Sequence, residues 1–427
     1  MHRKLRILII TLFITHSSLA QVLQPITLQA AEDTFLEKNY ELLAQRYRVD
    51  AGKALVQQTR LWSNPSFSTT WGFGTTDRVQ PFYGGNGGQI TYDVDQLITL
   101  AGKRNKQVQL ARLNVAASQS AFYELMRTLR LQLRSSYYQL YFLQETEKVL
   151  QEQLSNLQKI VNAYTEADKK GSVAHADVVR LRALLVGITN DYADLKQQEL
   201  AAQLNLQQLL GSGLQFAPRV DTEELVRYNM AGHTLAALTD TALANRPDLR
   251  MAQQQLQQAQ VNYRLQKALA VPDLHVGATY DKNGSYAPNF IGLTLGIDLP
   301  FWNRNQGNIR AAGNEVKAQE QSLAQSNNIV ITEVQQALEK IRLADQRYRA
   351  LDFRSFSQEY DRLIAEVALN FRKGNISLLQ FIDYFNSYSD NVKNINKLLL
   401  DRITAYEELN FVTGAELFRK QDAGNGK

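Results

Sequence analysis

The sequence has no cysteine, which excludes disulfide bonds, thiolate metal ligands and a lipid-bearing cysteine after an export signal. Histidine is also scarce, and the three histidines beyond residue 20 are scattered, without the spacing of a nucleophile or a ligand set. His175 and Asp177 form a candidate ligand pair, but an acid beside a helix start is more simply favoured by the helix dipole. The sequence therefore predicts no enzyme, no metal site and no cofactor.

Long apolar runs are also missing: no stretch of about 18 consecutive apolar residues occurs, so no transmembrane helix is expected. Residues 1–20 have the pattern of an export signal, with a basic start, a short apolar run and small residues at Ser18 and Ala20. Removing the three basic residues of this segment lowers the formal net charge from +5 to about +2 (44 minus 42). Because that charge is small and no basic block is interleaved with aromatics, no nucleic-acid partner is expected.

Glycine and proline are absent between Gly102 and Gly171, which predicts one helix over about 102–170, roughly 100 Å long at about 1.5 Å per residue. Apolar residues recur along it with a period of 3.5, the pattern of a coiled-coil seam. Gly171-Ser172 ends this helix, and a return helix is predicted over about 172–210. The seam positions are Phe122, Met126, Leu129, Leu133, Ser136, Leu140, Leu143, Glu147, Leu150, Leu154, Leu157, Val161 and Tyr164.

Two short stretches before the long helix alternate apolar and polar residues, which predicts strands over about 65–74 and 89–98. They follow a helical pattern running from about 26 to 61, and Thr75 to Gly88 is expected to be a glycine-rich loop between them.

The same order of elements recurs about 205 residues later, which predicts a tandem repeat. Its strands are expected at about 273–281 and 290–299, and its long helices at about 308–373 and 375–413, with a shift of the seam near Leu351. The expected organisation is a signal at 1–20, a first repeat at 21–211, a small irregular segment at 212–234, a second repeat at 235–414 and a tail at 415–427.

Four strands in one chain are too few to close a barrel, and an open sheet leaves unpaired edges. Strands with one apolar and one polar face in an exported protein are typical of a barrel wall with lipid outside and a polar lumen inside. The chain is therefore expected to oligomerise, and its helices to continue the tube away from the membrane.

The mature sequence resembles the TolC family of outer-membrane efflux channels over essentially its whole length. The resemblance depends on the tandem repeat, on Asn64-Pro65-Ser66 and Pro272-Asp273-Leu274, and on Gly171 and Gly374 at the hairpin tips. The junction Leu100-Ala101-Gly102-Lys103-Arg104 is similar to that of the heavy-metal efflux branch, represented by CzcC and CusC. Lipid-anchored relatives carry a cysteine after the signal, where this chain has Gln21.

The resemblance implies a mixed fold, in which an all-α tunnel of long helices in the periplasm joins a transmembrane β-barrel in the outer membrane. It implies a homotrimer in which four strands from each protomer form a 12-stranded barrel. The tunnel docks onto a periplasmic adaptor and an inner-membrane pump of the RND type, and the channel conducts passively.

The resemblance also assigns roles to particular positions. The periplasmic gate corresponds to Gln380 and Asp383, where only the second position keeps the acid of the family. The adaptor-docking tips are Lys170, Gly171, Ser172, Lys373, Gly374 and Asn375. The alternation along the strands, in turn, predicts that Asp93, Asp95, His275 and Asp298 line the barrel lumen.

Alternatives remain at this stage. Metal cations, drugs and type I secretion substrates are all compatible with such a duct, and heavy-metal cations are one candidate class. A soluble periplasmic coiled-coil adaptor would share the helical hairpins, but it would have no need of four strands patterned for lipid.

Overall fold

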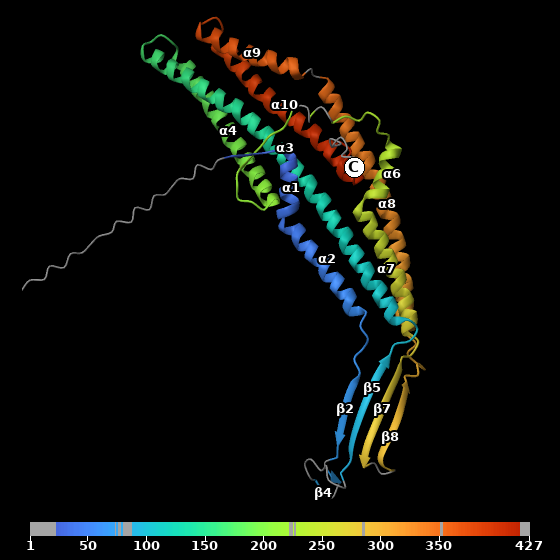
Figure 1. Ribbon diagram of the computed structural model, residues 1–427. Coiled ribbons are helices and arrows are strands. Elements are labelled where there is room, and N and C mark those ends of the chain that lie inside the picture. Colours follow the sequence, from blue (N-terminus) through green and yellow to red (C-terminus); the bar gives the residue numbers. More distant parts are fainter. Residues whose placement is uncertain are drawn as a thin grey trace, which may run out of the picture. The chain divides into compact units, whose positions relative to one another are not determined.

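The protein is described by a computed structural model that covers residues 23–72, 74–75, 78–79, 88–221, 225, 228–283, 287–350 and 353–418. Long helices and one four-stranded sheet make up most of the chain (Figure 1). The predicted signal at 1–20 and the end of the predicted tail lie outside the described residues.

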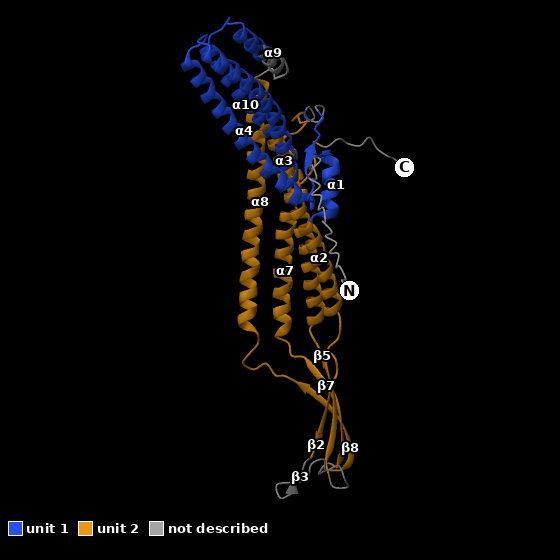
Figure 2. Ribbon diagram, turned by 90° about the vertical axis from the view of Figure 1, so that its left-hand side faces the viewer, with its two compact units in different colours: residues 1–39, 133–225, 353–400 blue, residues 40–132, 226–352, 401–427 orange. Residues whose placement is uncertain are grey.

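The chain divides into two compact units, each assembled from three separate stretches (Figure 2). Unit 1 comprises residues 1–39, 133–225 and 353–400, and unit 2 the rest. Helices α3 (Lys103–Lys169) and α10 (Leu378–Thr413) each contribute part of their length to both units. Each unit therefore takes elements from both halves of the sequence.

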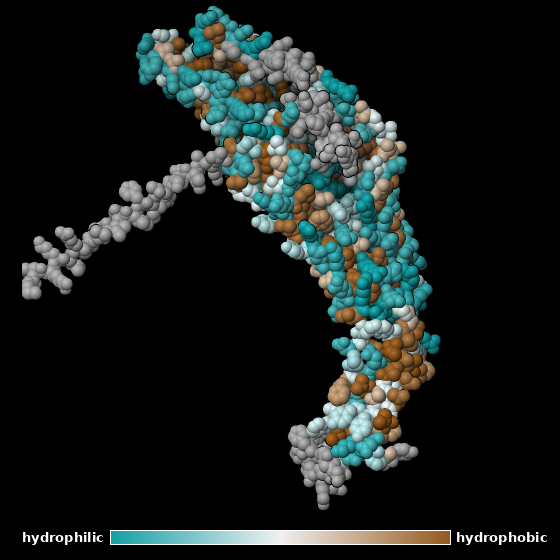
Figure 3. Space-filling view, viewed as in Figure 1, coloured by the Kyte–Doolittle hydropathy of each residue, from teal (hydrophilic) through white to brown (hydrophobic). Residues whose placement is uncertain are grey.

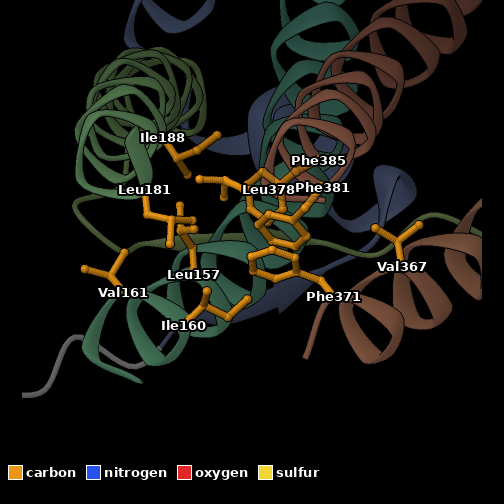
Figure 4. Close-up of a cluster of buried hydrophobic side chains, with 10 residues drawn as sticks. All are labelled: Leu157, Ile160, Val161, Leu181, Ile188, Val367, Phe371, Leu378, Phe381 and Phe385. Carbon is orange, nitrogen blue, oxygen red and sulfur yellow. The ribbon is translucent and has the colours of Figure 1, made fainter. Parts of the chain in front are cut away.

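Unit 1 is built around a cluster of ten buried apolar side chains (Figure 4). They come from α3, α10, α4 (His175–Leu210) and α9 (Phe353–Arg372), and the α3 members belong to the apolar seam or lie next to it. Phe371 stacks between Tyr164 and Phe381, with ring centroids 5.3 and 4.4 Å away. Each fully buried Leu or Phe stabilises the packing by about 1.5–3 kcal/mol. This explains how two helical hairpins hold together without a disulfide.

A small parallel strand pair also belongs to unit 1, where β1 (Gln24–Ile26) lies beside β6 (Phe216–Pro218). The Tyr137 hydroxyl is 2.6 Å from the Arg219 carbonyl oxygen and 3.1 Å from that of Ile26, so it fastens both segments to α3. The segment expected to be irregular at 212–234 thus contains a strand. Its partner is far away in the sequence, so no local pattern indicated it.

The N-terminal helical stretch is two helices, α1 (Leu28–Lys38) and α2 (Tyr40–Thr59), where one pattern from about 26 to 61 was expected. Asn39 separates them with an extended backbone, and its side-chain amide donates to the Leu209 carbonyl oxygen at 3.0 Å. That buried hydrogen bond stabilises the chain at the point where the helix is interrupted.

Unit 2 contains an antiparallel sheet with the strand order β2-β5-β7-β8. The strands are β2 (Ser66–Trp71), β5 (Ile90–Ile98), β7 (Leu274–Asn283) and β8 (Pro288–Ile297). β5 and β7 join the two hairpins, since Thr91–Ile98 pairs with Leu274–Asp281. The helices of this unit include α2, α6 (Leu235–Asn245), α7 (Pro247–Leu269) and α8 (Gln306–Arg349).

Two expected features differ in the structure. The expected glycine-rich loop at 75–88 contains a short antiparallel pair, β3 (Gly74–Thr75) with β4 (Arg78–Val79), while residues 80–87 lie outside the described part. The helix expected over 308–373 is divided into α8, which ends at Arg349, and α9, which begins at Phe353. The division coincides with the shift of the apolar seam near Leu351, because a seam that changes frame cannot stay on one face of a straight helix.

Candidate functional site

The register of the sheet separates its side chains into a polar and an apolar face, because successive residues of a strand point to opposite sides. Asp95 lies level with Ser66 on β2 and Gly277 on β7, and Gly277 with Thr294 on β8. These small and polar positions share one face. The line of residues two positions further along each strand lies on the same face and is also small and polar. That second line consists of Ser68, Asp93, Thr279 and Gly292.

Two acidic side chains of β5 on the polar face form hydrogen bonds with residues of β7. His275 Nδ1 is 3.0 Å from Asp95 Oδ1, and the Thr279 hydroxyl donates to Asp93 Oδ1 at 2.6 Å. Asp298 comes just after the end of β8 and is exposed. The structure therefore brings Asp95 and His275 into contact, although 180 residues separate them.

The opposite face of the sheet is apolar and exposed. Ile291, Leu293 and Leu295 of β8 are 76%, 86% and 74% exposed, and Figure 3 shows brown apolar surface gathered on one side of the strand region. Tyr92 stacks between Phe67 and Tyr280 across three strands, with 6.3 Å between centroids on each side. Exposed apolar surface of this kind on a regular sheet is typical of contact with lipid or another protein.

The junction between sheet and helix explains the Leu100–Arg104 motif. Gly102 has a φ of +66°, a left-handed conformation that suits glycine, and α3 begins directly after it. Lys103 is buried, and its Nζ is 2.7 Å from Asp273 Oδ1, which also accepts the Leu100 backbone N–H at 2.8 Å. The guanidinium of Arg104 lies over the Trp62 ring at 4.2 Å. This motif thus fastens the start of α3 to the start of β7.

The two predicted hairpin tips share one backbone design. At the first, Gly171 has a φ of +68°, and the N–H groups of Gly171 and Ser172 donate to the carbonyl oxygens of Asp168 and Ala167. At the second, Gly374 has a φ of +76°, and the corresponding donors are Gly374 and Asn375. Both pairs of bonds form the Schellman motif that ends a helix. The tip residues Lys170, Gly171, Ser172, Lys373, Gly374 and Asn375 are all exposed.

The predicted gate residues lie at the start of α10, and both are exposed. The Ser377 N–H donates to Gln380 Oε1 at 2.9 Å, while the Gln380 N–H donates to the Ser377 hydroxyl oxygen at 3.3 Å. This reciprocal pair is a capping box, which gives Gln380 a structural role that sequence reasoning missed. The signal for it, Ser three positions before Gln, is readable in the sequence.

The candidate ligand pair His175 and Asp177 forms a different contact. His175 Nδ1 is 2.8 Å from Asp168 Oδ2, across the hairpin tip. Among the described residues, no group of three or more histidine, aspartate or glutamate side chains is arranged to hold a metal ion.

Unit 2 also contains a buried polar network that the sequence patterns do not indicate. Asp345 of α8 accepts from Arg402 Nε and from the Tyr406 hydroxyl of α10, both at 2.8 Å. Burial, followed by the Asp345 carboxylate, raises the pKa of Tyr406 well above its ordinary value. Single polar residues on a helix do not indicate their partners, so only the packed structure reveals this network.

Comparison with known proteins decides which family these features belong to. Residues 33–212 and 238–415 match the model of a family described as outer membrane efflux protein. The chain belongs to this family. The resemblance to the TolC family predicted from the sequence is thereby confirmed, and the chain is an outer-membrane protein.

Two relatives of this outer membrane efflux protein are named after different substances, pyoverdine and metals. It is 25% identical over 259 residues to the pyoverdine export outer membrane protein OpmQ of Pseudomonas putida, covering 58% of this chain and 53% of OpmQ. The chain thus spans about half the length of that relative. It is 22% identical over 310 residues to the cobalt-zinc-cadmium resistance protein CzcC of Cupriavidus metallidurans, covering 72% of this chain and 71% of CzcC.

Solved structures share its fold. CusC superposes with a TM-score of 0.73 at 18% identity, covering 91% of this chain and 92% of that one. The outer membrane channel CmeC of Campylobacter jejuni gives 0.73 at 15% identity, covering 91% and 85%. None of the helices in the described ranges combines the length and apolar character needed to cross a membrane.

Proposed function

We propose that this protein forms a passive exit duct in the outer membrane, through which an inner-membrane pump drives its substrates. The observation that supports this most directly is the four-stranded sheet with one exposed apolar face and one polar face. Within the described residues, no further strand pairs with the outer edges of β2 and β8. Known membrane barrels have at least about eight strands, so the sheet of one chain is too small to close.

Three copies complete the barrel in this proposal. β2 and β8 run in opposite directions, because each neighbouring pair in the sheet is antiparallel. The β8 edge of one copy and the β2 edge of the next therefore continue an antiparallel barrel, in which three four-stranded sheets give 12 strands. The long helices continue the duct as a periplasmic tunnel, and α3 alone is about 100 Å long at about 1.5 Å per residue.

Membrane fractionation tests this duct against the alternative of a soluble periplasmic adaptor. The duct requires the protein to fractionate with the outer membrane and to run as a heat-resistant trimer band in detergent. A monomer in the soluble periplasmic fraction would favour the adaptor and overturn the proposal.

The hairpin tips are the proposed docking surface for a periplasmic adaptor. They are exposed, and a Cβ added at Gly171 or Gly374 meets no atom within 4 Å, so the surface is open. Because the chain has no cysteine, single cysteines at Ser172 or Asn375 are unambiguous crosslinking sites. They should crosslink to the adaptor in cells with a working pump, whereas a cysteine at exposed Tyr47 of α2 should not. Absence of crosslinks at both tips would reject docking there.

The proposed substrates are heavy-metal cations, and drugs or secreted polypeptides are the alternative. The acids on the polar face support cations, since rings of carboxylates favour cations in a pore. The name of CzcC agrees with this choice, while that of OpmQ points to a different cargo. Changing Asp93, Asp95 and Asp298 to Asn should reduce the potassium-to-chloride permeability ratio in planar bilayers. An unchanged ratio would mean that these acids give no argument for cations as the substrates.

Two repeats are proposed for the chain, at 21–211 and 235–414, with the segment 212–234 between them. The family match in two stretches, 33–212 and 238–415, supports this division. The Schellman motifs support it as well. Those at Gly171 and Gly211 recur 203 residues later at Gly374 and Gly414 (374 minus 171 and 414 minus 211).

A further inference from the structure

Of the three histidines in the described part of the chain, His275 alone lies in the sheet. Its side chain is 43% exposed and that of its partner Asp95 is 38% exposed, so both reach the open polar face. The neighbouring position on β8 is Gly296, where an added Cβ would lie 3.4 Å from the Cβ of His275. The absence of a side chain there leaves space beside the imidazole.

The charged groups around His275 are acidic. Asp95 on β5, Asp298 after β8 and Asp273 before β7 all act on it electrostatically. Asp273 is already paired with Lys103 of α3. Apart from His275, the four strands of this sheet contain one basic residue, Lys282, which is an odd number of residues from His275 and therefore points to the other face. The imidazole is thus the group on this face that can gain a positive charge.

We propose that His275 is a specificity-determining residue of the duct, and that its protonation weakens the preference of the lumen for cations. This inference rests on the channel proposed above. Histidine titrates near pH 6.5 and aspartate near 3.9 in unperturbed peptides, so between about pH 8 and pH 5.5 histidine changes charge while carboxylates stay ionised. In a trimer, three imidazoles at one level add up to three positive charges to the lumen.

The experiment measures reversal potentials of the full-length protein in planar bilayers under a potassium chloride gradient, at about pH 8 and about pH 5.5. The wild-type permeability ratio of potassium to chloride should fall by a factor of about two or more on acidification. His275→Gln should abolish this fall, and His275→Lys should give a low ratio at both pH values. His233→Gln removes a histidine outside the sheet and should behave as wild type.

Two results separate the inference from the proposed function. A pH-independent ratio in the wild type, or an equal fall in His275→Gln, would overturn the role of His275 while leaving the channel intact. Absence of conductance in the wild type would instead reject the channel itself.

Discussion

Leu293 and Thr294 are adjacent residues of β8 that point to opposite faces of the sheet, because the register places them level with Ala278 and Gly277. If Leu293 faces lipid, Leu293→Arg should cost about 2–4 kcal/mol of folding free energy near the bilayer midplane, and Thr294→Arg should cost far less. Folding titrations into lipid bilayers measure both. Equal costs for the two variants would contradict the assignment of faces.

Asp248 provides a test of electrostatics away from the sheet. Burial tends to raise its pKa, but hydrogen bonds from Arg246, at 2.5 and 3.0 Å, and the charge of Arg127 together hold the pKa below its ordinary value. A lowered pKa stabilises the fold above the unfolded pKa of about 3.9, and this contribution disappears as the pH falls through the folded value.

Asp248→Asn should therefore lower the thermal unfolding midpoint at neutral pH, and the difference from wild type should shrink at about pH 3 or below. Asp50→Asn is the matched control, since Asp50 pairs with Lys53 on the surface, where both side chains are exposed to solvent, and its loss should leave the neutral midpoint unchanged. A difference for Asp248→Asn that is the same at both pH values would exclude an ionic origin.

At the scale of elements, the left-handed glycines decide where the long helices turn. Gly171→Ala places a Cβ in a conformation that costs about 1–2 kcal/mol for an L-residue. Gly187→Ala, in the exposed middle of α4 with nothing within 4 Å, should stabilise by up to about 1 kcal/mol. Chemical denaturation of both variants measures these opposite signs, and a stabilising Gly171→Ala would contradict the Schellman assignment.

The start of α10 carries the proposed gate. Gln380 and Asp383 are three residues apart and so lie on one side of the helix, opposite the buried Phe381 and Phe385. If Asp383 rings the periplasmic mouth in a trimer, Asp383→Ala should increase single-channel conductance and weaken block by divalent cations added on the periplasmic side. Gln380→Glu keeps an acceptor for the capping box and adds a ring of acids, so it should strengthen that block. Unchanged block in both variants would place the pair outside the pore.

At the scale of the whole molecule, the proposed barrel needs contact between β8 of one copy and β2 of another. Cysteine pairs drawn from Ser66, Ser68 or Thr70 and from Gly292, Thr294 or Gly296 all lie on the polar face. At least one such pair should give covalent trimers on oxidation, because residues directly opposite each other on neighbouring strands are about 4.5–5.5 Å apart at Cβ. Replacing the β2 member by a cysteine at Phe67, on the other face, should abolish the crosslink. Crosslinks that form equally from both faces would argue against an ordered β2–β8 pairing.

Local sequence patterns predict much of this architecture. The two-residue alternation of Ile291 to Ile297 already separates an apolar from a polar face, and the absence of glycine between Gly102 and Gly171 already predicts a helix of extreme length. Gly171 and Gly374 likewise indicate the turns. These features are local because strand alternation, helix continuity and left-handed turns depend on residues within a few positions of each other.

Other features depend on which distant segments come together. The pairing of β5 with β7 brings Asp95 to His275, the pairing of β1 with β6 orders the segment after Gly211, and the packing of α8 on α10 buries Asp345 with Arg402. Each of these contacts is selected by the burial and hydrogen bonding of the complete fold, and a stretch of sequence carries no record of its distant partner. Local sequence patterns thus predict the kinds of element and the family, whereas the long-range pairing of strands and helices selects which charged groups meet on the polar face.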